Sequence, residues 1–306
     1  MAAVNVLLRS FITRTTVTDA PTVGGGVVAL PAIALSSATP DGELLAVNRR
    51  VELKETVLSR NLTIRAQGWV VLDLGGCTLS GSLTISGAGS VLVKGGTVHG
   101  HVLFDEGLKH VMCHNLFVVG SLRVNGAKGK AFLVSTTVSN VHTTAIHVDA
   151  KEHVFANAVS VSHVMLPETP AENKVIWLVS QDHDVDVNSL KVNEVTSFAK
   201  KMQVVVLDAQ SNVRATNISI HSAAAPRGVV EGVVPTAGGD KHPVLANIDV
   251  EARSGGEAAQ MQLVMPEGII VTETSGEGFT RPIVASAEAS RVQGHVAPVV
   301  HRVGAE

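Results

Sequence analysis

Residues 61–81 read "NLTIRAQGWVVLDLGGCTLSG", and residues 82–100 repeat the same pattern as "SLTISGAGSVLVKGGTVHG". Each stretch contains three short runs in which apolar and polar residues alternate, and each ends on a glycine. The pattern continues in "HVLFDEGLKHVMCHNLFVVG" (101–120) and "SLRVNGAKGKAFLVSTTVSN" (121–140). Because alternation with period two is typical of strands, and because the runs are too short for helices, each unit predicts three short strands.

The repeat is about 20 residues long and continues into the second half of the chain with longer steps. A turn residue lies between the second and third runs of each unit. These turn residues are Gly76, Gly96, Asn115, Thr136, Asn157, Asn188, Asn217, Asn247 and Gly268. They are separated by 20, 19, 21, 21, 31, 29, 30 and 21 residues. We interpret the longer steps as the same unit with insertions that form loops along one edge. The predicted insertions are 164–174, 193–203, 235–242 and 251–260.

The recurrence of one turn at one point of every unit predicts that like residues stack on like, which the antiparallel hairpins of a sandwich do not require. Three strands per coil of about 20 residues, with neighbouring coils about 4.8 Å apart, describe a parallel β-helix. We therefore predict an all-β fold with a single-stranded parallel β-helix, or β-solenoid, at 61–272. Residues 1–60 are predicted to form an N-terminal cap or attachment segment, and residues 273–306 an irregular C-terminal cap or tail.

The three-strand coil with an asparagine at its second turn resembles the right-handed parallel β-helix of the pectate-lyase-like superfamily. The resemblance covers about residues 61–272 and rests on the repeat, without a catalytic signature. It implies a right-handed coil and, inside it, a hydrogen-bonded ladder of stacked turn asparagines. The implied ladder consists of Asn115, Asn157, Asn188, Asn217 and Asn247. Buried asparagines one coil apart satisfy one another's donors and acceptors. We therefore expect "NIS" at 217–219 to belong to the ladder, with Ile218 and Ile220 facing inward, and not to accept a glycan.

The composition argues against several function classes. A net charge of −3 and the lack of a basic tract argue against nucleic acid and a charged membrane surface as partners. No apolar run reaches the roughly 18 residues of a membrane span. The chain has no Tyr and only two Trp, so it is poor in aromatic platforms for sugars. Residues 1–20 are poor in acidic residues and contain Arg9 and Arg14, a composition shared with organellar transit peptides, but they lack a secretory pattern. We favour a strand or arm of the mature protein, with a targeting peptide as the alternative.

The best local cluster of acidic residues is "QDHD" at 181–184, with Asp208 one unit later. If the chain is an enzyme, Asp182, Asp184 and Asp208 are the candidate catalytic residues. Asp182 and Asp208 would be offset by roughly 10 Å along the strand and one coil, near the carboxylate separation of inverting glycosidases. We favour solvated turn carboxylates, because the Gly-His-Gly and Arg-Ile-Lys patterns of polygalacturonase-like proteins and the calcium-binding Asp cluster of pectate lyases are absent.

Four histidines, His99, His101, His110 and His114, lie in two adjacent units and invite interpretation as metal ligands. The alternation of the runs turns His99 and His110 outward on different faces. We therefore predict exposed strand histidines, and neither a metal site nor a cofactor.

Three function classes remain. The first is a structural or adhesive β-helix of a virion surface, such as a capsid decoration protein, a spike or a tailspike-like fibre. The second is a polysaccharide lyase or glycoside hydrolase, and the third is a bacterial adhesin or passenger domain. The missing secretory and catalytic patterns favour the first, a protein that acts by rigid display and attachment without catalysis.

This function implies synthesis in the host cytoplasm and a place on the virion surface, with an extracellular location as the alternative. The expected partners are two further copies in a homotrimer, and a capsid or other virion protein bound through the N-terminal segment. A host-surface glycan is a further candidate ligand. Neither nucleic acid nor a membrane span is expected.

Overall fold

A computed structural model describes residues 30–238 and 243–253 and five short strands outside them. These strands are β1 (Thr22–Val23), β2 (Gly26–Val27), β25 (Met261–Val264), β26 (Ile270–Glu273) and β27 (Ile283–Val284). All regular elements among the described residues are strands, so this part of the chain contains no helix that could cross a membrane. The predicted arm at 1–20 lies outside the described residues.

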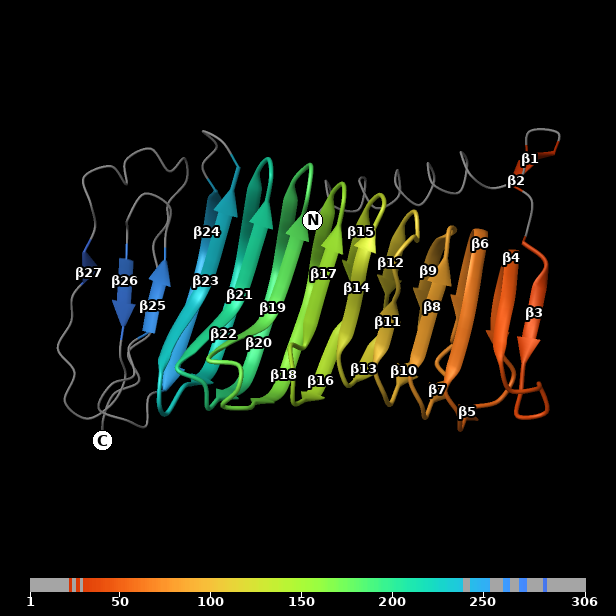
Figure 1. The fold of residues 1–306 in the computed structure, drawn as a ribbon, viewed down its shortest axis with the longest axis horizontal. Coiled ribbons are helices and arrows are strands. Elements are labelled where there is room, and N and C mark those ends of the chain that lie inside the picture. The colour runs from red at the N-terminus through yellow and green to blue at the C-terminus, as the bar shows by residue number, and fades with distance from the viewer. Residues whose placement is uncertain are drawn as a thin grey trace.

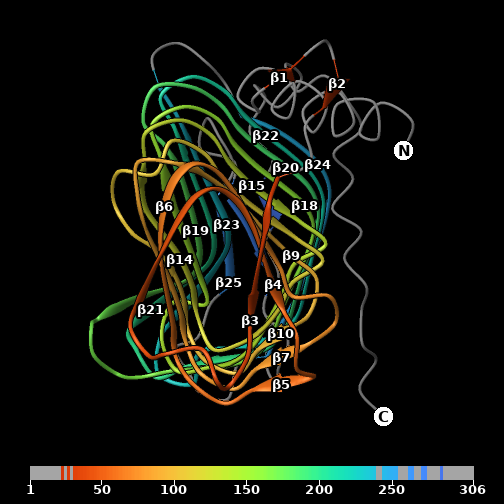
Figure 2. The same cartoon turned by 90° about the vertical axis from the view of Figure 1, so that its right-hand side faces the viewer.

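The strands wind into a parallel β-helix whose coils stack along the long axis of the molecule (Figure 1). Seen along that axis, the coils lie behind one another around one core (Figure 2). Between residues 78 and 150 each coil has three faces. The first face consists of β8 (Leu83–Gly87), β11 (Val102–Phe104), β14 (Leu122–Ala127) and β17 (Ile146–Ala150). The second consists of β9 (Ser90–Lys94), β12 (Val111–His114) and β15 (Ala131–Val134). The third consists of β7 (Thr78–Leu79), β10 (Thr97–Val98), β13 (Phe117–Val119) and β16 (Thr137–Val141).

Long strands combine two faces in the other coils. At the N-terminal end, β4 (Glu43–Leu53) and β6 (Leu62–Asp73) each run along the first face and continue along the second. Two short strands, β3 (Ala32–Leu35) and β5 (Val57–Leu58), complete this end of the helix. After residue 150, the second and third faces are combined in β18 (Val154–Leu166), β20 (Val185–Ser197), β22 (Val213–Ala224) and β24 (Val244–Arg253). The first face continues in β19 (Glu172–Ser180), β21 (Lys201–Ala209) and β23 (Val229–Ala237). Strands of one face pair in parallel from coil to coil throughout.

The parallel helix begins upstream of residue 61, where the sequence predicted its first coil. β3 pairs in parallel with β4, and β4 pairs in parallel with β6. Ala46 and Val51 of β4 are fully buried, so this strand already contributes to the core. Its outward residues include Leu45 and Val47, which are 54% and 43% exposed. These outward apolar residues hide the apolar–polar alternation from which the strands of the coil were predicted.

The parallel pairing ends before residue 272, the predicted end of the helix. β25 pairs in parallel with β23, but β26 pairs with β25, and β27 with β26, in antiparallel order. An antiparallel strand covers the open edge that a parallel coil leaves behind. Apart from Glu273 and β27, the predicted segment 273–306 lies outside the described residues.

The longer repeats of the second half arise mainly from longer strands. On the first face, β8, β11, β14 and β17 have three to six residues, whereas β19, β21 and β23 have nine each. The predicted insertion 164–174 therefore reduces to a loop at 167–171, and the insertion 193–203 reduces to 198–200. The added residues pair in register with the next coil, which is why they extend the sheet. Parts of the predicted insertions 235–242 and 251–260 lie outside the described residues.

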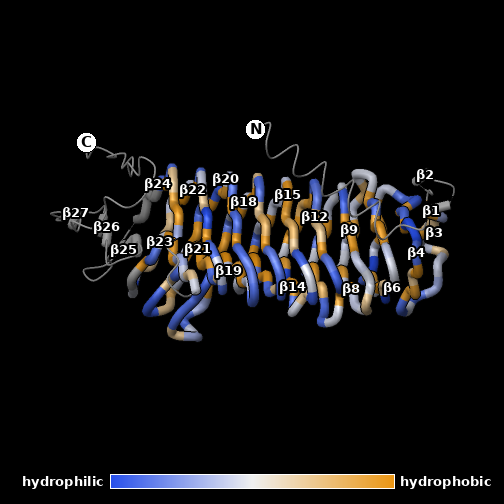
Figure 3. The backbone as a smooth tube through the Cα atoms, turned by 90° about the horizontal axis from the view of Figure 1, so that it is seen from above, coloured by the Kyte–Doolittle hydropathy of each residue, from blue (hydrophilic) through white to orange (hydrophobic). Residues whose placement is uncertain are grey.

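The core runs the length of the coil and consists mainly of Val, Leu, Ile and Ala side chains. In β6, Leu62, Ile64 and Ala66 are buried while the residues between them are more exposed. The same alternation of hydrophobic and hydrophilic positions is visible along the coils in Figure 3. Phe104 of β11 has no exposed surface and is the largest of the fully buried side chains.

The turn between the second and third faces requires the left-handed backbone region. Gly96 has φ of +80°, and a Cβ there would collide with the carbonyl oxygen of Cys77 one coil earlier. The later coils place non-glycine residues at this turn with φ between 48° and 62°, namely Asn115, Ser135, Ala158, Ser189, Asn217 and Asn247. Gly and Asn tolerate this conformation best, which explains why they recur in the repeat. In three coils the left-handed residue is the neighbour of the predicted turn residue Thr136, Asn157 or Asn188.

The inward and outward phenylalanines provide a test of the register. We expect Phe104→Ala to lower the free energy of unfolding by about 3–5 kcal/mol, because it removes a fully buried ring and leaves a cavity. Phe117→Ala is the matched control: this residue is 38% exposed, and we expect a change of about 0.5 kcal/mol. Urea unfolding followed by circular dichroism measures both. Equal losses would contradict the assigned faces.

A network of charged side chains joins three coils on the second face. Asp73 Oδ2 lies 2.7 Å from Arg50 Nη2 and 2.9 Å from Lys94 Nζ, and Asp73 Oδ1 accepts the Gly75 N–H at 3.1 Å. Burial alone raises the pKa of Asp73, but the hydrogen bonds from Lys94 and Arg50, the Lys94 charge and the Gly75 N–H outweigh it. The pKa of Asp73 is therefore lower than usual.

This lowered pKa predicts the acid sensitivity of the fold. A carboxylate whose pKa is depressed by folding contributes stability above its unfolded pKa of about 3.9 and loses it as the pH falls through the folded value. We therefore expect wild-type melting temperatures to fall more steeply below pH about 4 than those of Asp73→Asn, measured from pH about 7 to pH about 2. Asp105→Asn, at an exposed carboxylate, is the control for the loss of one surface charge. Parallel wild-type and Asp73→Asn curves would contradict the assignment.

Candidate functional site

Four of the five predicted ladder asparagines are joined by side-chain hydrogen bonds. The Asn188 Nδ2 group donates to Asn157 Oδ1 at 2.9 Å. Asn217 Nδ2 in turn donates to Asn188 Oδ1 at 3.1 Å, and Asn247 Nδ2 donates to Asn217 Oδ1 at 3.0 Å. Thr216 Oγ1 also donates to Asn188 Oδ1, at 3.1 Å. A continuous chain of amides therefore spans four successive coils.

The expectation that these amides lie inside the coil is wrong. Asn217 and Asn247 are exposed, and Asn157 and Asn188 are half-buried. The inward positions after the turn belong to apolar residues such as Ile218, which is fully buried, as is Ile220. Two consecutive residues at each turn point away from the core, so the ladder runs along the outer surface. "NIS" at 217–219 is therefore not shielded by burial.

Asn115 lies apart from the other four asparagines. In the intervening coil, the position in register with Asn157 is Val134, whose side chain has no hydrogen-bonding group. The ladder also changes register by one residue, since Asn188 pairs with Thr216 while its hydrogen bond comes from Asn217. A one-residue shift is tolerated because two adjacent turn residues face outward in each coil.

The three predicted catalytic carboxylates have separate surroundings. Asp182 is exposed at the turn after β19, with one oxygen 3.9 Å from Lys151 Nζ. Asp208 lies on the outer side of the first face, where its Oδ2 accepts the Trp177 indole N–H at 2.8 Å. Asp184 precedes β20 and belongs to a different group, together with His153 and Asp186. Asp182 and Asp208 therefore lie in different surroundings and do not form the carboxylate pair that their spacing in the sequence suggested.

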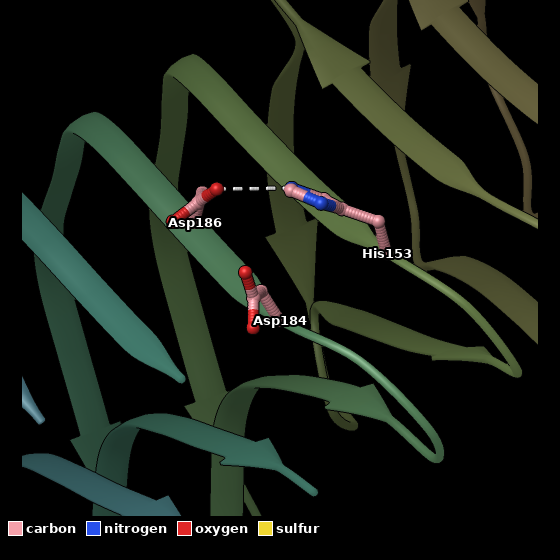
Figure 4. A group of neighbouring side chains, drawn as sticks. All are labelled: His153, Asp184 and Asp186. Atoms are coloured by element: carbon pink, nitrogen blue, oxygen red, sulfur yellow. Dashed lines mark ion pairs between the residues drawn. The ribbon is translucent and has the colours of Figure 1, made fainter. Parts of the chain in front are cut away.

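The group around Asp184 follows directly from the register of the coils (Figure 4). Val154 pairs with Val185, so the residues that precede them, His153 and Asp184, occupy equivalent places on adjacent coils. Asp186 lies two residues after Asp184 and points to the same outer side. His153 Nε2 is 3.1 Å from Asp186 Oδ2. One imidazole nitrogen and one carboxylate oxygen from each aspartate lie within 4.8 Å of one another.

The next coil completes the surroundings of this group. Asn212 and Arg214 occupy the positions that follow Asp184 and Asp186 in register. Asp184 Oδ1 accepts the Asn212 backbone N–H at 2.9 Å and its side-chain amide at 2.8 Å, while Arg214 Nη2 lies 3.3 Å from Asp184 Oδ2. Burial raises the pKa of Asp184, but the bonds from Asn212 and Ser211 and the Arg214 charge outweigh it and lower the pKa.

Asp186 is less well satisfied than Asp184. Its Oδ1 is buried and has no hydrogen-bond partner, and Arg214 Nη1 lies 3.6 Å away from it. The His153 ring is nearly parallel to Phe132, at 3° and with centroids 6.4 Å apart. Phe132 belongs to the preceding coil, so the imidazole is held in place from the side opposite the carboxylates.

Sequence reasoning named Asp184 but missed His153 and Asp186, although the repeat contained a signal for both. His153 precedes Asn157 by four residues, and Asp184 precedes Asn188 by the same number. Equal offsets from the repeat position put the two side chains next to each other on neighbouring coils. Asp186 follows in "QDHDVD" (181–186), where the alternation keeps it on the side of Asp184.

A second polar site lies on the third face, where a hollow of about 640 Å³ is lined mainly by residues of β16, β18, β20 and β22. His163 Nδ1 lies 2.6 Å from Glu194 Oε2 within this lining. Both residues have left-handed backbones, with φ of 54° and 52°, in a column with Asn140 and Ser222. Non-glycine residues in this conformation store strain, which is frequent where ligands bind.

A third polar group occupies the outer side of the first face. The Trp177 ring stacks on His147 at 4.5 Å and 14°, and Lys174 Nζ lies 3.7 Å from the ring centroid. Burial lowers the pKa of His147, and this outweighs the opposite effect of Asp149. Together with Asp208, these contacts link the indole to residues of its own coil and of both neighbouring coils.

The four histidines considered as metal ligands serve separate turns. His99 is exposed at the end of β10, and His114 is half-buried in β12. His101 Nδ1 lies 2.9 Å from Ser121 Oγ, and His110 Nδ1 accepts the backbone N–H of Lys130. The ring nitrogens of His101 and His110 therefore take part in contacts between neighbouring coils.

Comparisons of the chain with protein-family models, curated proteins and solved structures found no match. The parallel β-helix is thus established by the strand pairing of this chain alone.

The exposed position of the asparagine ladder determines how much it stabilises the fold. We expect Asn188→Ala to lower the free energy of unfolding by about 0.5–1.5 kcal/mol, because water replaces part of the lost hydrogen bonding. Asn193→Ala, at a half-buried position outside the ladder, is the control for loss of an amide. A loss above about 3 kcal/mol, measured by urea unfolding, would contradict the surface placement.

Proposed function

We propose that this chain is a structural or adhesive β-helix protein that acts by rigid display and attachment, without catalysis, on the surface of a virion. The observation that carries the proposal is the use of outward carboxylates as contacts within or between coils. Asp73 binds side chains of two neighbouring coils, Asp184 binds Asn212 and Arg214, and Asp208 binds Trp177. Carboxylates engaged in this way stiffen a rod, whereas a general acid or base must be free to exchange its proton.

The proposed assembly is a parallel homotrimer that presents its polar loops outward. The second face offers a column of outward apolar residues, because Val71, Leu92, Met112, Phe132 and Phe155 follow one another in register. In rods related by a parallel threefold axis, equivalent coils lie at the same height. The apolar columns of the three copies therefore face one another. In this proposal, the N-terminal segment attaches the trimer to a capsid or other virion protein, and a host-surface glycan is a ligand of the outer loops.

The alternative function, a polysaccharide lyase or glycoside hydrolase of pectate-lyase-like fold, is favoured by one observation. The His163–Glu194 pair at 2.6 Å lies in a hollow of about 640 Å³. A histidine and a carboxylate at this distance can exchange a proton, as an acid–base pair requires.

Two measurements distinguish these functions. We expect size-exclusion chromatography with light scattering to give three times the chain mass of 31.8 kDa, and Phe132→Asp to reduce the assembly because a charge enters the apolar column. Phe117→Asp, on the third face, is the control and leaves the trimer intact. A monomeric wild type would overturn the trimeric rod. Depolymerisation of any member of a broad glycan panel, abolished by Glu194→Gln, would establish the enzyme instead.

A further inference from the structure

The contacts of His153, Asp184 and Asp186 leave one group unexplained. Asp186 Oδ1 is buried without a hydrogen-bond partner, although its carboxylate is otherwise held by His153. A buried carboxylate oxygen without a donor is costly unless a cation compensates it. The nearest cationic atom is Arg214 Nη1, at 3.6 Å, which is too far for a hydrogen bond.

The donor atoms are close to the geometry of a metal site. Zinc binds nitrogen and oxygen ligands at about 2.0–2.2 Å, so tetrahedral ligand atoms lie about 3.3–3.6 Å apart. His153 Nε2 and Asp186 Oδ2 are already 3.1 Å apart, and all three side chains offer atoms within 4.8 Å of one another. A side-chain rotation that moves the Asp184 oxygen by roughly 1 Å would close the triangle.

The surroundings prepare each side chain for this role. Phe132 holds the His153 ring by stacking. Asn212 occupies Asp184 Oδ1 with two hydrogen bonds and leaves Oδ2 to Arg214. The Arg214 side chain is 54% exposed, so the guanidinium can turn to solvent when another cation enters. Such supporting contacts around the ligands are typical of metal sites.

We propose that His153, Asp184 and Asp186 bind a divalent transition-metal ion of the Zn²⁺ type, with Arg214 as the competing cation in its absence. The imidazole nitrogen selects Zn²⁺ over Ca²⁺ and Mg²⁺, which prefer sites made only of oxygen atoms. The two carboxylates neutralise the ion, and solvent supplies the remaining ligand. His153 belongs to one coil and the two aspartates to the next, so the ion clips adjacent coils together.

The site lies where the architecture of the rod changes. His153 immediately precedes β18, the first strand that combines the second and third faces. An ion that binds the folded coils and not the unfolded chain stabilises them in proportion to its occupancy. This inference is independent of the proposed virion role.

Zinc binding to the full chain tests the proposal. After treatment with a chelator and its removal, isothermal titration calorimetry with Zn²⁺ is expected to give one site per chain, and Co²⁺ to give the visible absorption of a low-coordinate site. Asp186→Asn and His153→Gln are expected to weaken Zn²⁺ binding by roughly tenfold or more, since loss of outer partners alone has that effect. Ca²⁺ and Mg²⁺ are expected to bind far more weakly.

Two further variants separate this site from other histidines and from a change in folding. Arg214→Gln is expected to strengthen Zn²⁺ binding, because the competing cation is removed, whereas a purely structural ion-pair network predicts no gain. Asp182→Asn, at an exposed carboxylate nearby, is the matched control and keeps wild-type affinity. Circular dichroism confirms that each variant is folded. No Zn²⁺ binding by the wild type, or binding unchanged in both Asp186→Asn and Arg214→Gln, would overturn the proposal.

Discussion

Parallel pairing in register is the constraint on which the rest of this structure depends. Each backbone hydrogen bond between coils places a residue directly above its equivalent, about 4.8 Å away. Val154, Val185 and Val213 stack in this way inside the core, and His153, Asp184 and Asn212 stack beside them on the surface. A side chain in such a column keeps the same two neighbours. Stacked asparagines therefore form a hydrogen-bonded ladder, and stacked opposite charges form a network of ion pairs. The outer polar sites are consequences of the core register.

The repeat could be predicted from the sequence because both its signals are local. Alternation identifies the inward residues, as in β6, and the left-handed turn demands Gly or Asn, as at Gly96 and Asn217. The N-terminal start of the helix was harder to predict, because Leu45 and Val47 are apolar on the outer side and break the alternation. The longer repeats were misassigned to loops because a strand extended by several residues and a loop add the same length to the chain.

The surface sites depend on whether a turn residue faces inward or outward, and this orientation was not predicted correctly from the sequence. Burial of the asparagines was inferred from a resemblance, whereas the turn of this chain directs two successive residues outward. His153 and Asp186 were not predicted because neither lies in the acidic cluster "QDHD" at 181–184. Offsets measured from the repeat position, rather than distances along the chain, bring His153 and Asp184 together.

The change in strand length along the first face has a mechanical consequence. The strands β8, β11, β14 and β17 span three to six residues and β19, β21 and β23 span nine each, so the outline of a coil is wider in the second half of the rod. The resistance of a rod to bending grows steeply with its width. Under a sideways load, this molecule therefore flexes first in the narrow coils between residues 78 and 150. The broad coils, which include His163, Glu194 and the asparagine ladder, would move as one stiff tip.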